Sequence, residues 1–192
     1  IAEETGYLNS YAKKGLRTPE QYYEHAIRQT HYANRLLKFT EGFQLYTVSE
    51  QNRGKFENGL NSSAQTFLNW SIQKHNQKDY ASAKFGLENI IATSKVSPTI
   101  KQNATNVYKT VLYEYAMTHP HFTERLALSI EGYNKYPTDI RFTNAINSSI
   151  NSLLHWSIVR QTNGAFEVAV DSYNRILAAP VLDSKIKSDV EY

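Results

Sequence analysis

The sequence predicts an all-α fold, and two observations support this prediction. Apolar residues recur at helical spacing along most of the chain, whereas the alternation typical of half-buried strands is scarce. Residues 56–72 return 86 positions later as residues 142–158, with Phe, Asn, Asn-Ser-Ser, Leu and Trp-Ser-Ile kept without a gap. At this offset, residues 56–106 and 142–192 share 14 identities in 51 positions, which predicts an internal duplication.

The first two helices are predicted from a capping signal and from apolar spacing. Residues 18–21, Thr-Pro-Glu-Gln, supply an N-cap residue, a Pro at the first helical position and a Gln placed to close a capping box. A second helix is expected to begin near Tyr32 and to run towards Tyr46. Residues 48–54 are polar and are predicted to form a loop.

Six further helices are predicted between turn and break signals. These signals lie at residues 76–79, 94–98, 119–121, 163–164 and 180. Ser97 or Thr99 is available to cap the helix that follows the second break. The expected helices cover approximately residues 55–75, 80–91, 99–117, 122–136, 142–161 and 166–179.

Pairs of these helices form a shorter repeating unit. Tyr80, Phe122 and Phe166 each open the second helix of a pair, and they lie 42 and 44 residues apart. Periods near this length are typical of helical-hairpin repeats, so about four hairpins are expected. The predicted organisation is an N-terminal cap or the end of a preceding unit at residues 1–16, a first two-hairpin unit at 17–97, a second at 98–182, and the start of a truncated further repeat at 183–192.

The residues at matching positions of the two halves resemble those of tetratricopeptide-like α-solenoids. They are Leu68-Asn69-Trp70 with Tyr80 and Ala83-Lys84, and Leu154-His155-Trp156 with Phe166 and Ala169-Val170. The resemblance implies a right-handed superhelix with a concave binding surface. It is a resemblance of architecture, because the period exceeds that of a minimal tetratricopeptide repeat and the Gly-x-x-Tyr pattern is absent.

Three features bear on the compartment. Cysteine is absent, which excludes disulfides and thiolate metal sites. The first residue is Ile rather than Met, so we expect a piece cut from a longer protein. The Asn-rich and Tyr-rich style, seen at residues 136–142, looks like repeat regions of secreted or wall-associated proteins of Gram-positive bacteria. This resemblance implies a secreted or cell-wall location, with the cytoplasm as the alternative.

Composition and charge exclude several classes of function. With 41% hydrophobic and 20% charged residues, the chain is expected to fold rather than to be disordered. Its net charge of +3 is spread along the chain, without the basic face of a nucleic-acid binder. No apolar run approaches the length of a membrane span. We therefore expect no nucleic-acid partner and no membrane insertion.

One face of the repeated helix is rich in amides and carries no charge. Helix surfaces that merely face water usually carry Lys, Glu and Arg, since Asn and Ser are poorer helix formers. An Asn side chain offers two donors and an acceptor with two lone pairs, which suit a peptide backbone or sugar hydroxyls. The predicted ligand-binding residues are Asn58, Gln65, Asn69, Asn103, Asn106, Tyr113, Asn144, Asn151 and His155.

The same residues also have a structural interpretation. Buried amides commonly bond to the backbone or to each other, and duplication would copy a neutral face without any role in binding. Asn61 and Asn147, at the edge of the apolar face, are expected to be structural. Trp70 and Trp156 could stack on sugars, but their place within the apolar arc favours packing in the core.

No motif in the sequence specifies a reaction. His119 and His121 with Glu124 are a conceivable metal set, but an extended His-Pro-His is expected to point its rings apart in a loop between helices. Gly-rich phosphate loops, His-Glu-x-x-His and Gly-x-Ser-x-Gly are absent. We therefore expect no catalytic residue, no metal and no cofactor.

The sequence thus predicts a non-catalytic interaction module, a scaffold that binds a peptide or protein along a concave, uncharged, amide-rich face. A glycan is the alternative ligand of that face. The alternative function is a structural spacer or an oligomerisation segment of a larger secreted cell-wall enzyme. An enzyme in its own right is the least favoured interpretation, because the sequence offers no constellation of acid, base and nucleophile.

Overall fold

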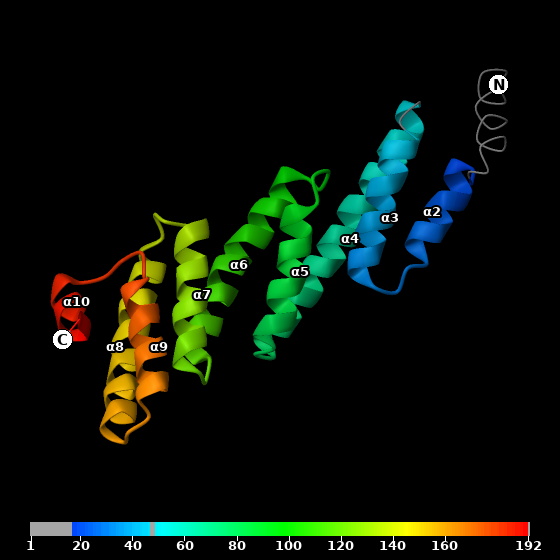
Figure 1. Ribbon diagram of the computed structural model, residues 1–192. Coiled ribbons are helices and arrows are strands. Elements are labelled where there is room, and N and C mark those ends of the chain that lie inside the picture. The colour runs from blue at the N-terminus through cyan, green and yellow to red at the C-terminus, as the bar shows by residue number, and fades with distance from the viewer. Residues whose placement is uncertain (1–16, 47–48, 192) are drawn as a thin grey trace, which may run out of the picture. The chain divides into compact units, whose positions relative to one another are not determined.

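The structure, a computed structural model, describes residues 17–46 and 49–191, and within these ranges it contains helices and no strands (Figure 1). The all-α prediction is therefore confirmed for the described residues. The predicted cap at residues 1–16 lies outside them. The helices are α2 (Pro19–Ile27), α3 (Tyr32–Leu45), α4 (Glu50–Asn76), α5 (Tyr80–Ala92), α6 (Pro98–Thr118), α7 (Phe122–Lys135), α8 (Ile140–Thr162), α9 (Phe166–Leu177) and α10 (Ser184–Glu191).

The chain divides into two compact units, Ile1–Tyr108 and Lys109–Tyr192, with the boundary inside α6. Within each unit, helices that follow one another in the sequence pack against each other: α2 to α5 in the first unit and α7 to α10 in the second (Figure 1). Short connections make successive helices neighbours. This arrangement is compatible with stacked helical hairpins. None of the described helices combines the length and the apolar character needed to cross a membrane.

Local capping signals account for where several helices begin. At the start of α2 the predicted capping box is present: Gln21 N donates to Thr18 Oγ1 at 3.3 Å, and Thr18 N donates to Gln21 Oε1 at 3.0 Å. Asp79 caps α5 by accepting the Ser82 N–H at 3.2 Å. Ser97 Oγ accepts from the backbone N–H of Ile100 at 3.3 Å, so the prediction of Ser97 as a cap is confirmed.

The prediction of a loop at residues 48–54 is wrong from Glu50 onward, because α4 begins at this residue. Ser49 caps this end by accepting the Asn52 N–H at 3.1 Å. The first turns of α4 are polar, and a polar run of Glu, Gln, Asn and Arg forms helix readily once it is capped and continued by a packed segment. The other predicted helix ends agree with the observed ones to within two residues.

The two units bury the same side of their long helices. On α4 the buried residues include Phe56, Leu60, Ala64, Phe67 and Ser71. Their counterparts on α8, Phe142, Ile146, Ile150, Leu153 and Ser157, are buried as well. In the second unit this side of α8 joins Leu126 of α7 and Ile176 of α9 in one apolar cluster.

A glycine–phenylalanine contact recurs in both units. A Cβ built on Gly42 of α3 would lie 2.4 Å from the ring of Phe56, and one on Gly132 of α7 would lie 2.1 Å from the ring of Phe142. Only a residue without a side chain lets the ring come this close to the neighbouring helix. A Tyr stacks on each of these rings: Tyr46 on Phe56 at 5.4 Å and Tyr136 on Phe142 at 6.2 Å between ring centroids.

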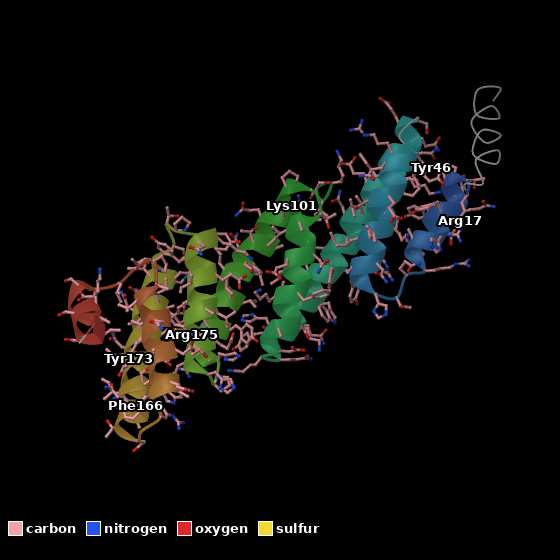
Figure 2. All side chains as sticks on the ribbon, viewed as in Figure 1. Arg17, Tyr46, Lys101, Phe166, Tyr173 and Arg175 are labelled. Atoms are coloured by element: carbon pink, nitrogen blue, oxygen red, sulfur yellow. The ribbon has the colours of Figure 1, made fainter. Side chains whose placement is uncertain are left out.

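Polar bonds join α2 to α3. The Tyr46 hydroxyl, at the end of α3, donates to the backbone carbonyl of Arg17, just before α2, at 2.6 Å, and Figure 2 labels both residues. The Tyr22 hydroxyl donates to Glu41 Oε2 at 2.5 Å, and Lys38 Nζ donates to the same oxygen at 2.7 Å. Hydrogen bonds from Lys38 and Tyr22 lower the pKa of Glu41. Burial and the bond to Glu41 raise the pKa of Tyr22.

Candidate functional site

The amide residues of α4 form a row on the outside of the helix. Asn58, Gln65 and Asn69 are exposed, as are Ser62 and Thr66 between them. We call these five residues the α4 row. Positions three, four and seven apart share one side of a helix. Gln65 Nε2 donates to Asn69 Oδ1 at 3.1 Å, so two of the predicted ligand residues are also partners of each other.

The predicted residues of α6 fall into different units. Asn103 and Asn106 are exposed in the first unit, where Gln102 Nε2 donates to Asn106 Oδ1 at 3.1 Å. Tyr113 is half-buried in the second unit, with the Arg141 guanidinium 5.9 Å from its ring centroid. The unit boundary therefore separates Tyr113 from the two asparagines, although all three residues belong to α6.

The second long helix carries a comparable row. Asn144, Ser148, Asn151 and His155 are exposed on α8, and we call them the α8 row. The row ends at Val159, an apolar residue whose side chain is 44% exposed. Like the α4 row, the α8 row carries no formal charge when His155 is neutral. Each row therefore offers hydrogen-bond donors and acceptors without ion pairing.

Asn61 has the structural role that the sequence predicts for it. Its side-chain Oδ1 accepts the backbone N–H of Ser97 at 2.8 Å, across 36 residues of sequence. This bond ties the loop before α6 to the middle of α4. Asn147, at the matching position of α8, is half-buried, and its structural role stays a prediction.

A pocket of about 500 Å³ opens beside Trp70. Tyr32 and Ala33 of α3, Phe67 of α4 and Phe85 of α5 also line it. Trp70 is half-buried rather than fully enclosed. The interpretation of Trp70 as a core residue therefore describes only one side of its ring, because the other side faces the pocket.

A smaller pocket, of about 200 Å³, opens beside Trp156 in the second unit. Phe122 and Thr123 of α7 and Leu153 of α8 also line it. Trp156 packs against the apolar cluster of this unit and is half-buried. Each of the two tryptophans is therefore both a packing residue and a pocket wall.

One feature of the sequence, apart from its apolar periodicity, indicates that both tryptophans reach the surface. Each Trp is followed, one helical turn later, by a cation. Lys74 Nζ lies 5.7 Å from the Trp70 ring centroid, and the Arg160 guanidinium carbon lies 4.9 Å from that of Trp156. A cation over an indole face favours a ring that reaches the surface. Periodicity alone cannot distinguish a pocket wall from a closed core, because both are apolar.

The histidine pair between α6 and α7 differs from the prediction. The rings of His119 and His121 approach to 5.7 Å between centroids, so the expectation that they point apart is wrong. The loop folds back on itself, because His121 N donates to His119 Nδ1 at 3.3 Å. Among residues 17–46 and 49–191, no group of three or more His, Asp or Glu side chains is placed to hold a metal ion.

Comparisons of the chain with protein-family models, with curated proteins and with solved structures found no match.

Proposed function

We propose that this chain is a non-catalytic interaction module that binds a peptide or an extended segment of a protein through its amide rows. The observation that carries the proposal is exposure: eight of the nine predicted ligand residues are exposed, and none of the eight is Lys, Arg, Asp or Glu. Long helices that only face water usually carry those four residues. A surface kept free of them suits a neutral, hydrogen-bonding ligand.

The chemistry of the rows fits a peptide backbone. Each Asn or Gln presents an N–H donor and a carbonyl acceptor, the same pair that an extended peptide exposes at every residue. The Gln65–Asn69 bond of 3.1 Å uses one donor and one acceptor lone pair and leaves the others free to bond a ligand. Sugar hydroxyls and carbonyls share this complementarity, so a glycan is the competing ligand for the same row.

The proposal extends to architecture and location. We propose that the hairpins stack into a right-handed, tetratricopeptide-like superhelix, duplicated at the 86-residue offset, with the rows on its concave side. Sequence identity between the halves and sequential packing of the helices support this arrangement. We also propose a secreted or cell-wall location, and this part of the proposal is based on the Asn-rich and Tyr-rich character of the sequence.

The test uses peptides selected from a displayed library of random linear sequences against the full chain. Asn58→Ala with Asn144→Ala is expected to weaken the selected peptides about tenfold, as for the loss of good interface contacts. Because the rows are uncharged, binding through them is expected to change little with salt. Glu57→Ala, at an exposed position of α4 outside the row, is the control.

The readout is affinity by calorimetry, with circular dichroism to verify the fold of each variant. Retained affinity in the folded double variant would exclude the rows as the binding surface. If the chain selects no peptide but binds oligosaccharides on a parallel array, the ligand of the rows is a glycan and not a peptide.

A second candidate, an oligomerisation segment, is favoured by one side of α9. Phe166, Val170 and Leu177 lie at helical spacing and are 62%, 55% and 36% exposed. Figure 2 shows Phe166 and Tyr173 on this helix. Adjacent exposed apolar side chains of this kind mark association surfaces. Sedimentation over a range of concentrations tests it: Phe166→Ser with Val170→Ser should abolish any self-association, and a wild-type protein that stays monomeric removes this candidate.

A further inference from the structure

The Trp70 and Trp156 pockets occupy matching places in the two units. Each lies where the first turn of a short helix, α3 or α7, meets the C-terminal half of the next long helix, α4 or α8. Trp156 follows Trp70 by 86 positions, and Thr123 follows Ala33 by 90, the offsets of their helices. Both pockets are lined by a Trp, by a His just before the short helix and by an aromatic residue at its first position.

The rims of both pockets are held by the same bond. Arg35 of α3 donates from Nη2 to the carbonyl oxygen of Gln29 at 2.7 Å. Arg125 of α7 donates from Nε to the carbonyl oxygen of His119. In both units the bond fixes the loop that leads into the pocket helix. A preformed rim lowers the entropic cost of binding a ligand there.

The pocket walls are aromatic and only partly covered. The Tyr32 ring stacks on Phe67 at 5.2 Å between centroids and lies 5.9 Å from Trp70. Phe85, on the far wall, is 54% exposed. The exposed parts of these rings can be removed from water only by an apolar group that enters the pocket. Partly covered Trp and Tyr residues are the usual anchors of interfaces.

Each pocket has a cation close to its tryptophan, and the two cations differ in their partners. No carboxylate lines either of them. The cation of Lys74 lies over Trp70 and that of Arg160 over Trp156. Lys74 also pairs with Asp79 at 3.2 Å, whereas Arg160 is exposed to solvent. Because the Arg160 guanidinium lies over the Trp156 ring, a ligand carboxylate beside this ring would form a charge-assisted hydrogen bond with it.

The pockets are separate from the amide rows. Trp70 follows Asn69 directly on α4, so its side chain leaves the helix about 100° away from the row. The pocket accordingly has walls on α3 and α5, whereas no residue of the α4 row lines it. A ligand can therefore occupy a pocket without touching the row.

We propose that each pocket is a binding site for a large apolar side chain, Leu or Phe, of a partner peptide, and that in the second unit an Asp or Glu beside this side chain pairs with Arg160. The site goes beyond the function proposed for the rows and does not depend on it. The larger pocket takes an aromatic side chain, and the smaller one takes Leu.

The experiment begins with random linear peptides displayed on phage and selected against the full chain at low salt. We expect enriched peptides to share Leu or Phe beside Asp or Glu. A synthetic peptide with the enriched sequence is then titrated into Trp70→Phe and Trp156→Phe proteins, each of which retains a single Trp. The fluorescence of the retained Trp should change on binding, because the ligand covers its ring.

Pocket-filling variants test the site without removing packing residues. Ala33→Phe and Thr123→Phe add a ring at the two pocket rims and should weaken the peptide at least about tenfold in the pocket that is filled. Arg160→Glu should weaken it several-fold in the second unit, more at low salt than at high salt. The controls are Gln44→Phe and Asn134→Phe, exposed positions at the opposite ends of the same helices.

The outcomes separate this site from the rows. Peptides that lose affinity in the filled pockets but not in Asn58→Ala with Asn144→Ala support the pockets and leave the rows without a role. The proposal is overturned if selection enriches no acidic apolar sequence, or if folded filled variants bind as tightly as the wild type. It is also overturned if the enriched peptide leaves both fluorescence signals unchanged, or if self-association of the chain alone produces the changes.

Discussion

At the scale of single residues, two asparagines of α4 lie three positions apart but have different surroundings. Asn61 accepts the Ser97 N–H at 2.8 Å, whereas Asn58 is exposed in the α4 row. Asn61→Ala is expected to lower the free energy of unfolding by about 1–2 kcal/mol, because the backbone N–H before α6 loses its acceptor. Asn58→Ala should change it by less than about 0.5 kcal/mol.

Urea unfolding followed by circular dichroism measures both values. Asn61→Asp is a useful companion, because it keeps an acceptor and should retain most of the stability near neutral pH. Equal losses for Asn58→Ala and Asn61→Ala would mean that the bond to Ser97 is not a stabilising contact.

Two glycines in equally helical surroundings should respond to Ala with opposite signs. A Cβ on Gly132 would lie 2.1 Å from the ring of Phe142, whereas a Cβ on Gly54 would meet nothing within 4 Å. Gly132→Ala is expected to destabilise by about 1–3 kcal/mol, since a buried ring must move. Gly54→Ala should stabilise by about 0.5–1 kcal/mol, because Ala favours a helix interior over Gly.

Thermal unfolding of the two glycine variants provides the measurement. The matched variant Gly42→Ala, which would place a Cβ 2.4 Å from Phe56, should behave like Gly132→Ala. A stabilised Gly132→Ala protein would show that α7 and α8 are not packed as closely as the contact with Phe142 requires.

At the scale of elements, the contact between α2 and α3 depends on an ionised carboxylate. Hydrogen bonds from Lys38 and Tyr22 lower the pKa of Glu41 below its ordinary value of 4.5. A group whose pKa is lower in the folded state contributes stability that is fully present above its unfolded pKa. That contribution is lost as the pH falls through the lower, folded pKa. We expect the stability of α2 to decline below about pH 4.5 partly for this reason.

Glu41→Gln tests this dependence. The variant should be less stable than the wild type at neutral pH, and the difference should shrink as the pH falls below the ordinary carboxyl range. Glu57→Gln, at an exposed position of α4, is the control. Unfolding in urea at a series of pH values gives the comparison, and a difference between Glu41→Gln and wild type that is the same at every pH would contradict the role of Glu41 ionisation.

The helices were predictable from the sequence because their signals are local. Thr18 caps α2 through Gln21, Ser97 caps α6, and each bond spans three residues. The start of α4 was not predictable from apolar spacing, because its first turns are polar and bury little. A capping Ser followed by helix-compatible residues was the available signal, and it is weaker than a periodic apolar face.

The candidate sites were predictable only in part. Exposure of the α4 and α8 rows follows from helical periodicity, which fixes the side opposite a buried face. The Trp70 and Trp156 pockets depend on where α3 and α7 begin relative to the long helices. That is a matter of packing between elements, which no single helix encodes. The bond between Tyr22 and Glu41 joins different helices and was hidden from the sequence for the same reason.

At the scale of the whole molecule, the division into two compact units predicts that stability is local. Leu60 of α4 and Leu153 of α8 are both fully buried, one in each unit. Replacing either by Ala is expected to cost about 2–5 kcal/mol where it packs. In chains built from sequentially packed hairpins, such a loss of stability mainly affects the helices next to the substituted one.

Native-state hydrogen exchange resolves this distribution by helix. Leu153→Ala should accelerate amide exchange in α7, α8 and α9 by at least about tenfold, while amides of α3 and α4 keep wild-type rates. Leu60→Ala should produce the reverse pattern, so each variant is the control of the other. If either variant accelerates exchange equally in all these helices, the chain unfolds as one cooperative body. The two compact units would then unfold together rather than separately.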